Sequence, residues 1–112
     1  MIKWTHYGEE YTGRLLLQQY ANGALAVRLM CNDHEIYAVL SVNVPGMSET
    51  LDGTTFVAKT YSENEGLVEQ LIEQGVFQTT GCACEVGRAG PQPILRVHPV
   101  YLVSGDSTIG KG

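Results

Sequence analysis

The sequence has little positive charge, no long hydrophobic run and no signal-peptide pattern. Its seven lysines and arginines form no cluster, which argues against direct binding to nucleic acid. No segment is apolar for long enough to cross a bilayer, and no apolar stretch follows the single lysine near the start. These absences predict a cytoplasmic protein that binds neither a membrane nor nucleic acid.

Motifs of common catalytic sites are also missing. The chain has neither a phosphate-binding glycine loop nor a nucleophile elbow. Glu69 and Glu73 have the spacing of a solvated helix face, and a small sheet protein offers little cleft for a pair of catalytic carboxylates. His6, His34 and His98 are not set at metal-ligand spacing. We therefore expect no catalytic residue and no cofactor, and a protein that acts by binding.

The three cysteines allow one alternative. Cys82 and Cys84 stand in "GCAC" with one residue between them, whereas the paired cysteines of structural zinc sites usually have about two to four residues between them. With Cys31 and His34 they would complete a tetrahedral zinc set, so a small zinc protein stays open as an alternative function. The plainer interpretation makes Cys31 a small core residue and the pair ordinary strand residues.

Length and composition indicate one globular domain. The chain has 112 residues, of which 44% are hydrophobic and 17% charged. Its 13 glycines and 6 tyrosines favour strands and turns over a helical bundle. We expect a single compact domain over residues 1–103 and a flexible, small and polar tail over 104–112.

The first half of the chain predicts a meander of antiparallel strands. Asn22-Gly23 is a strong signal for a type I′ hairpin between strands 14–20 and 24–31. A further strand over 36–44 alternates apolar and polar positions, and an earlier strand is expected at 2–7. These strands would form most of one sheet.

The second half adds a strand, a helix and a hairpin. A short strand is expected within 54–61, followed by one helix over 62–75 that begins with a capping box at Ser62 and Glu65 and ends at Gly75. Leu67, Val68, Leu71 and Ile72 form the apolar stripe of this helix, and strands within 76–86 and 93–103 form a last hairpin. The predicted fold is α+β: an antiparallel sheet, built from the meander and the C-terminal hairpin, with one helix packed on a face.

Charge is distributed unevenly. Between residues 33 and 73 a single base, Lys59, stands against eight acids: Asp33, Glu35, Glu49, Asp52, Glu63, Glu65, Glu69 and Glu73. Such a surface attracts basic partners, and tyrosine is enriched at binding hot spots. The candidate partner-binding residues are therefore acidic, with one tyrosine: Glu49, Asp52, Tyr61, Glu63, Glu65, Glu69 and Glu73.

Several segments carry a resemblance to known proteins: "WTHYGEEY", "YANGALAVRL", "YAVLSVNVPG", "FVAKTYSEN", "IEQGVFQTTG" and "PILRVHP". Together they resemble a family of small uncharacterised bacterial domains found on plasmids, integrative elements and phages. The resemblance covers roughly residues 3–99 and departs from the pattern around "CACEVGRAGPQP". Its motifs are structural, so it transfers no catalytic residue.

The resemblance implies a biological setting. Small acidic proteins of mobile elements often inhibit host defence by stoichiometric binding, which predicts an anti-CRISPR or anti-restriction protein whose partner is a CRISPR effector or another nuclease subunit. The alternative is a self-associating accessory module of plasmid maintenance or conjugation. The sequence leaves both a monomer and a homodimer open.

Overall fold

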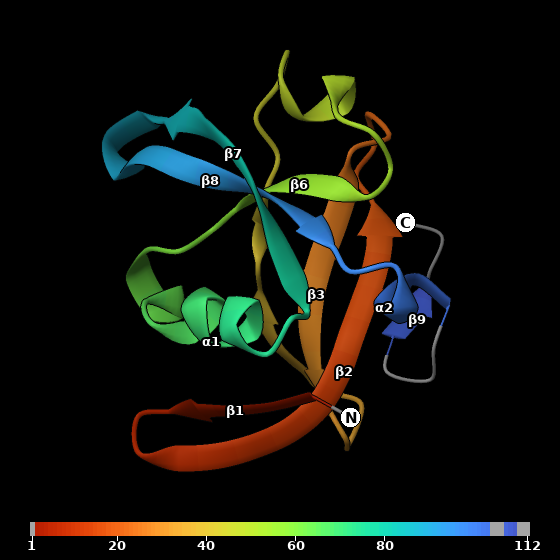
Figure 1. The fold of residues 1–112 in the computed structure, drawn as a ribbon, viewed down its shortest axis with the longest axis vertical. Helices are drawn as coiled ribbons and strands as arrows, with labels where there is room; N and C mark the ends of the chain where they lie inside the picture. The colour runs from red at the N-terminus through yellow and green to blue at the C-terminus, as the bar shows by residue number, and fades with distance from the viewer. Residues whose placement is uncertain (1, 104–106, 110–112) are drawn as a thin grey trace.

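The computed structural model describes residues 2–103 and 107–109, and its strands form two sheets (Figure 1). The first sheet is an antiparallel meander of β1 (Ile2–His6), β2 (Glu9–Gln19), β3 (Leu25–Cys31) and β4 (Ile36–Val39), with β9 (Ser107–Ile109) parallel to β2. The second sheet is antiparallel and has the order β5 (Ser41–Val42), β6 (Thr55–Ala58), β8 (Gly90–Val97) and β7 (Phe77–Val86).

The helical segments are short. They comprise α1 (Leu67–Glu73), α2 (Val100–Val103) and three 3₁₀ turns, η1 (Ser48–Thr50), η2 (Ser62–Asn64) and η3 (Gly87–Ala89). In Figure 1, α1 lies between β1 and the beginning of β7, and it contacts both strands. The α+β class is thus confirmed, but the single sheet expected from the sequence is replaced by two.

The two sheets diverge at Leu40, which is fully buried. The backbone N–H of Leu40 donates to the Val27 carbonyl of the first sheet at 2.8 Å, and the Leu40 carbonyl accepts from Lys59, just after β6, at 2.8 Å. The predicted strand over 36–44 is therefore divided into β4 and β5. Its alternating pattern did not reveal the division because a strand keeps the same period when it changes pairing partner.

Strand β2 is shared between two parts of the first sheet. Its residues 9–13 pair with β1, and its residues 13–19 pair with β3. Gly13 lies at the overlap, where a Cβ atom would be 1.9 Å from the Met30 carbonyl oxygen. Glycine is therefore required for the close approach of the β2 and β3 backbones, and β2 curves strongly along its length (Figure 1).

The hairpin turns differ from the prediction in type. The two strands flanking Asn22-Gly23 do pair, but of these two residues only Gly23 has a positive φ, so the turn is not type I′. Tyr20 and Ala24 close a three-residue loop instead, with the Tyr20 N–H donating to Ala24. Two successive positive φ angles occur in the β1–β2 turn, at Tyr7 (52°) and Gly8 (80°).

The predicted helix over 62–75 is shorter than expected. Ser62 has a positive φ of 59° and begins η2, so it does not cap α1, and Gly66 in the left-handed region separates η2 from α1. The predicted end is confirmed: Gly75 has a φ of 80°, and its N–H donates to Ile72 while that of Val76 donates to Leu71.

Asn64 explains why the helix does not begin at Ser62. Its side chain is fully buried, and its Nδ2 donates to the carbonyls of Val39 at 2.6 Å and Lys59 at 3.0 Å. These two carbonyls belong to opposite sides of the Leu40 crossing. The tertiary hydrogen bonds therefore hold residues 62–64 in a 3₁₀ turn against both sheets.

The hydrophobic core lies between the sheets and α1. Phe56 and Phe77 of the second sheet meet edge to face with ring centroids 5.0 Å apart. The first sheet contributes Leu15, Val27 and Leu29, and the predicted helical stripe is confirmed, since Leu67, Val68 and Leu71 are fully buried and Ile72 packs against the cluster. The range expected as a tail, 104–112, contains β9, and its remaining residues lie outside the described part of the chain.

Substitution of Gly13 by alanine should separate β2 from β3. We expect Gly13→Ala to lower the free energy of unfolding by about 3 kcal/mol or more, because the backbone must move to admit the methyl group. Urea denaturation measures the loss. Gly53→Ala is the matched control, since a Cβ at Gly53 meets no atom within 4 Å; an equal loss in both variants would contradict the close-approach argument.

Removal of the Asn64 amide should weaken the connection between the sheets. We expect Asn64→Ala to cost about 2–4 kcal/mol in urea denaturation, because two carbonyls lose their donor and a cavity remains. Asn64→Asp should cost more at neutral pH, since a buried carboxylate donates to neither carbonyl. Asn43→Ala, which removes one surface hydrogen bond, is the control and should change stability by less than about 0.5 kcal/mol.

Candidate functional site

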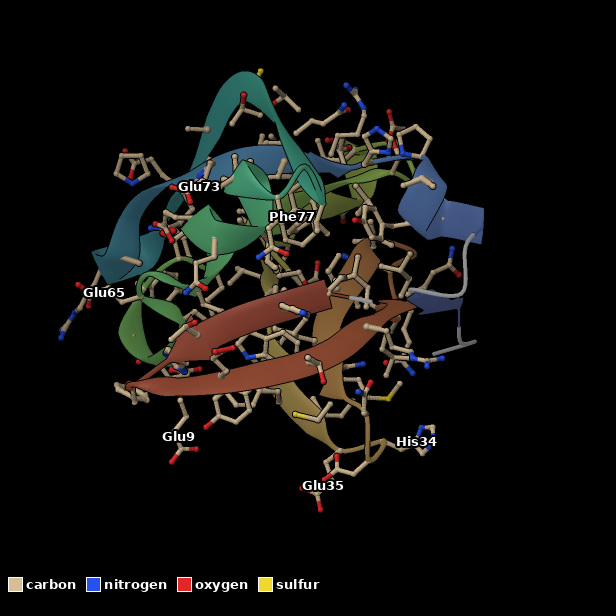
Figure 2. All side chains as sticks on the ribbon, turned by 60° about the horizontal axis from the view of Figure 1, so that its bottom comes forward. Glu9, His34, Glu35, Glu65, Glu73 and Phe77 are labelled. Atoms are coloured by element: carbon tan, nitrogen blue, oxygen red, sulfur yellow. The ribbon has the colours of Figure 1, made fainter. Side chains whose placement is uncertain are left out.

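The predicted partner-binding residues lie in two different places. Glu65 lines a hollow together with Tyr7, whereas Asp52 lines another with Cys82 and Arg96. Glu63, Glu69 and Glu73 belong to the η2–α1 segment, and Figure 2 shows Glu65 and Glu73 on the side of the molecule that this segment forms. The structure therefore does not join all seven residues in one patch.

Glu49 and Asp52 have local structural partners. The Glu49 carboxylate accepts from the Gly46 N–H at 2.8 Å. Asp52 accepts from the N–H and the hydroxyl of Thr54 at 2.8 and 2.6 Å, and these hydrogen bonds lower the pKa of the Asp52 carboxyl. Both carboxylates thus stabilise the loop between β5 and β6.

Lys59, the one base of the acidic segment, has one acidic neighbour, Glu63, and one aromatic neighbour, Tyr61. Its Nζ donates to Glu63 at 2.6 Å and lies 5.7 Å from the centroid of the Tyr61 ring. The hydrogen bond from Lys59 lowers the pKa of Glu63 to about 2. Tyr61 therefore lies beside a cation that the chain itself supplies, while Glu65, Glu69 and Glu73 remain exposed on the following segment.

A hollow of about 500 Å³ separates the β1–β2 turn from η2 and the start of α1. Thr5, His6 and Tyr7 form one wall, and the other is formed by Ser62, Glu65, Gly66 and Gln70. The Gln70 side chain fixes the two walls relative to each other, because its Oε1 accepts from the Thr5 N–H at 2.8 Å and its Nε2 donates to the Thr5 carbonyl at 2.7 Å. Gln74 repeats the contact one turn later on the Lys3 carbonyl, at 2.6 Å.

Tyr7 is the most unusual residue of the hollow. It is 83% exposed and has a φ of 52°, a conformation that a bulky side chain rarely adopts. Ser62, on the opposite wall, has a φ of 59°. Backbone strain of this kind gathers at functional sites, and here it occurs on both sides of one hollow.

An aromatic cluster supports the β1–β2 turn from behind. Trp4 stacks on Tyr11 with centroids 5.9 Å apart, and Tyr37 packs 4.6 Å from Tyr11 and 5.4 Å from Trp4. The His6 Nδ1 lies 2.6 Å from the Tyr37 hydroxyl, while the His6 ring packs 4.1 Å from that of Tyr7. Hydrogen bonding with Tyr37, with smaller contributions from desolvation and Glu9, raises the pKa of Tyr11 to about 12. The exposed Tyr7 ring therefore packs against His6, which the aromatic cluster holds in place through Tyr37.

The residue types of this hollow are suited to a cation. Aromatic rings attract an ammonium or guanidinium group through their faces, and the Glu65 carboxylate adds a negative charge beside them. Sequence reasoning identified Glu65 but missed Tyr7 and His6. A turn signal was present in "HYGE", because Gly8 stands between two predicted strands. Asn22-Gly23 is the stronger hairpin motif, since asparagine adopts a positive φ more readily than tyrosine.

The four residues of the zinc alternative are not brought together. Cys31 ends β3 and His34 lies exposed in the following turn (Figure 2), whereas Cys82 and Cys84 belong to β7 of the other sheet. Within residues 2–103 and 107–109, no three His, Cys, Asp or Glu side chains are grouped as metal ligands. Burial and the carboxylates of Asp33 and Glu35 raise the pKa of Cys31. This favours the protonated thiol over the thiolate, which is the form that reacts and binds metals.

Comparisons of the chain with protein-family models, with curated proteins and with solved structures found no match. Among the described helices, none is long and apolar enough to cross a membrane.

The contact between Lys59 and Glu63 gives a testable pH dependence. The pKa of Glu63 is lowered from 4.5 to about 2, so the stabilisation by this carboxylate is complete above pH 4.5 and is lost as the pH falls through about 2. In Lys59→Met we expect the pKa of Glu63 to rise back toward 4.5, as followed by NMR of the side-chain carboxyl carbon. An unchanged pKa would show that Lys59 is not the cause.

Proposed function

We propose that this protein is a non-enzymatic inhibitor that binds a nucleic-acid-handling protein of a host defence system and covers the basic surface of that partner. The observation that carries the proposal is the hollow between Tyr7 and Glu65, in which an exposed aromatic ring and a carboxylate face the same space. A lysine or arginine side chain of the partner fits this chemistry.

The charge around the hollow supports a basic partner. Glu65 is exposed between η2 and α1, Glu69 and Glu73 are exposed on α1, and Lys59 already forms an ion pair with Glu63. A field of one sign accelerates association with a surface of the opposite sign, and it does so less at high salt. The acidic segment thus steers the encounter.

Affinity requires a residue that excludes water at the centre of the contact. Tyr7 has this role in the proposal, because a tyrosine on a rigid turn buries a large area at a small cost in side-chain entropy. His6 packs against the Tyr7 ring and is itself held by Tyr37, so little further ordering is needed on binding.

The class of target comes from the resemblance to domains of plasmids, phages and integrative elements. In that setting the basic partner is a CRISPR effector or a restriction nuclease subunit in the bacterial cytoplasm. The mechanism is occlusion: carboxylates of the inhibitor occupy lysines and arginines that the nuclease uses to hold nucleic acid. Neither a cofactor nor a catalytic step of the inhibitor is involved.

The proposal is tested by target capture followed by a nuclease assay. The tagged chain is expressed in bacteria with active CRISPR and restriction systems, and retained proteins are identified by mass spectrometry. The captured nuclease is then assayed with purified inhibitor at increasing ratios. We expect inhibition to saturate near a one-to-one ratio; no captured nuclease, or no loss of cleavage, would contradict the proposal.

Two matched variants locate the binding surface. Glu65→Lys with Glu69→Lys should weaken binding of the nuclease by about tenfold or more, because two attractive charges become repulsive. Asp33→Lys with Glu35→Lys makes the same change in net charge at exposed positions of the β3–β4 turn, which line no part of the hollow. Equal weakening by both pairs, measured by calorimetry at two salt concentrations, would show that net charge rather than this surface determines affinity.

A self-associating accessory module is the second candidate function. The observation in its favour is an open strand edge on β7, in the other sheet. This edge is independent of the hollow at Tyr7, so both surfaces can operate in one molecule.

A further inference from the structure

Strands β7 and β8 form an arm that extends past the end of β6. β6 pairs with β8 only at Ile94–Arg96, whereas β7 pairs with β8 at residues 77–79 and, after a bulge at Thr80 and Gly81, at residues 82–86 up to the η3 turn. Residues 82–93 therefore form a two-stranded ribbon, which Figure 1 shows projecting from the body of the molecule.

Backbone hydrogen bonds at the end of β8 establish which backbone groups of this arm point outward. The Val97 N–H donates to Thr54, on the β6 side, and the His98 N–H donates to Val76, on the β7 side. The backbone hydrogen-bonding groups of successive residues point to alternate sides of a strand. Those of Pro93 and Pro91 therefore point to the β6 side, and those of Ile94 and Gln92 point to β7. Their partners on β7 follow the same alternation.

On β7, Cys82 and Cys84 are therefore the residues that bond toward β8, opposite Ile94 and Gln92. The Thr80 hydroxyl agrees with this assignment, since it accepts from the Cys82 N–H at 3.2 Å and donates to the Ile94 carbonyl at 2.6 Å. Ala83 and Glu85 consequently direct their N–H and C=O groups to the outer edge.

The two edges of the arm are protected differently. On the β8 side, Pro91 and Pro93 remove the N–H groups that another strand would need. The β7 side has neither a proline nor a lysine between residues 77 and 86, and beyond the bulge at Thr80 and Gly81 its outer edge has no strand partner within the described residues. An edge with free donors and acceptors is a template for one more strand.

We infer that this edge pairs antiparallel with β7 of a second copy of the chain, about a two-fold axis at Ala83. The sequence of β7 is self-complementary in this register. Ala83 faces Ala83 and Cys82 faces Cys84 of the second copy, while Glu85 lies nearest the bulge at Thr80 and Gly81 and not another Glu85, so that like charges are not opposed. The two four-stranded sheets then join into one continuous sheet.

In the same register Cys82 of one copy lies close enough to Cys84 of the other to form a disulfide, so oxidation can detect the dimer. With Ala83 at a hydrogen-bonded pair, Cys82 and Cys84 of the second copy form a non-hydrogen-bonded pair, in which Cα atoms are about 4.5 Å apart. This separation is within the range that a disulfide spans. In the structure both thiols are free, and Cys82 is exposed.

The first test is the oligomeric state of the full chain under reducing conditions. Sedimentation velocity over a range of concentrations should show a reversible dimer. Ala83→Pro removes the two N–H donors at the axis and should raise the dimer dissociation constant by about tenfold or more. A monomer at every concentration, or a dimer unaffected by Ala83→Pro in a variant with unchanged circular dichroism, would overturn the inference.

The second test identifies the register, in a Cys31→Ala background with glutathione disulfide as oxidant. A thiolate displaces one glutathione from the oxidant, and the thiolate of the second copy displaces the other, which leaves one protein disulfide and two reduced glutathiones. Neither Cys82→Ser nor Cys84→Ser alone should cross-link efficiently. A one-to-one mixture of the two should cross-link, because Cys84 of one copy then faces Cys82 of the other.

Each contrary result is distinct. Efficient cross-linking of Cys82→Ser alone would place the axis at Cys84 and overturn the Ala83 register, and equal cross-linking in every sample would indicate random collision. Glu65→Lys with Glu69→Lys should dimerise like the unmodified chain, since these residues are not on β7. Failure of the dimer is thereby separated from failure of the proposed nuclease inhibition.

Discussion

The crossing of the chain at Leu40 is the constraint on which the two-sheet architecture depends. At this residue one backbone N–H bonds to β3 and the adjoining carbonyl bonds to the residue after β6, so a single buried position belongs to both sheets. The Asn64 amide stabilises the crossing by donating to carbonyls on each side of it. A buried donor with two acceptors is expensive to remove, which makes this junction rigid.

The position of the proposed binding hollow follows from that junction. Because Asn64 holds η2 against both sheets, Ser62 and Glu65 are presented toward the β1–β2 turn and not toward bulk solvent alone. Gln70 and Gln74 complete the arrangement from the other side by bonding to the backbone of β1. These amides also occupy backbone groups of β1, so one edge of the first sheet is closed by side chains.

The exposed strand edges thus differ in what protects them from pairing with another strand. β1 is covered by glutamine side chains, and the β8 side of the arm has prolines, whereas the β7 edge is interrupted only by the bulge at Thr80 and Gly81. The hollow is lined by the β1–β2 turn, η2 and the start of α1 and not by β7, so the proposed nuclease binding and the proposed self-association use different residues.

Local patterns were sufficient to predict most strands, the end of the helix at Gly75 and the buried stripe of Leu67, Val68 and Leu71. Each of these depends on residues close together in the chain, through side-chain period or through the φ that glycine permits. The unequal distribution of acids along the chain could also be read from the sequence, because each charge belongs to a residue type and needs no tertiary contact.

Only the tertiary structure decided the rest. The number of sheets depends on which strand supplies the partner of Leu40, and the alternation of side chains does not record that choice. The start of α1 depends on the long-range bonds of Asn64, which override the local capping signal at Ser62. For the same reason the sequence by itself determined the acidic residues of the candidate surface, but folding determined that Glu65 meets Tyr7 and that Asp52 lies elsewhere.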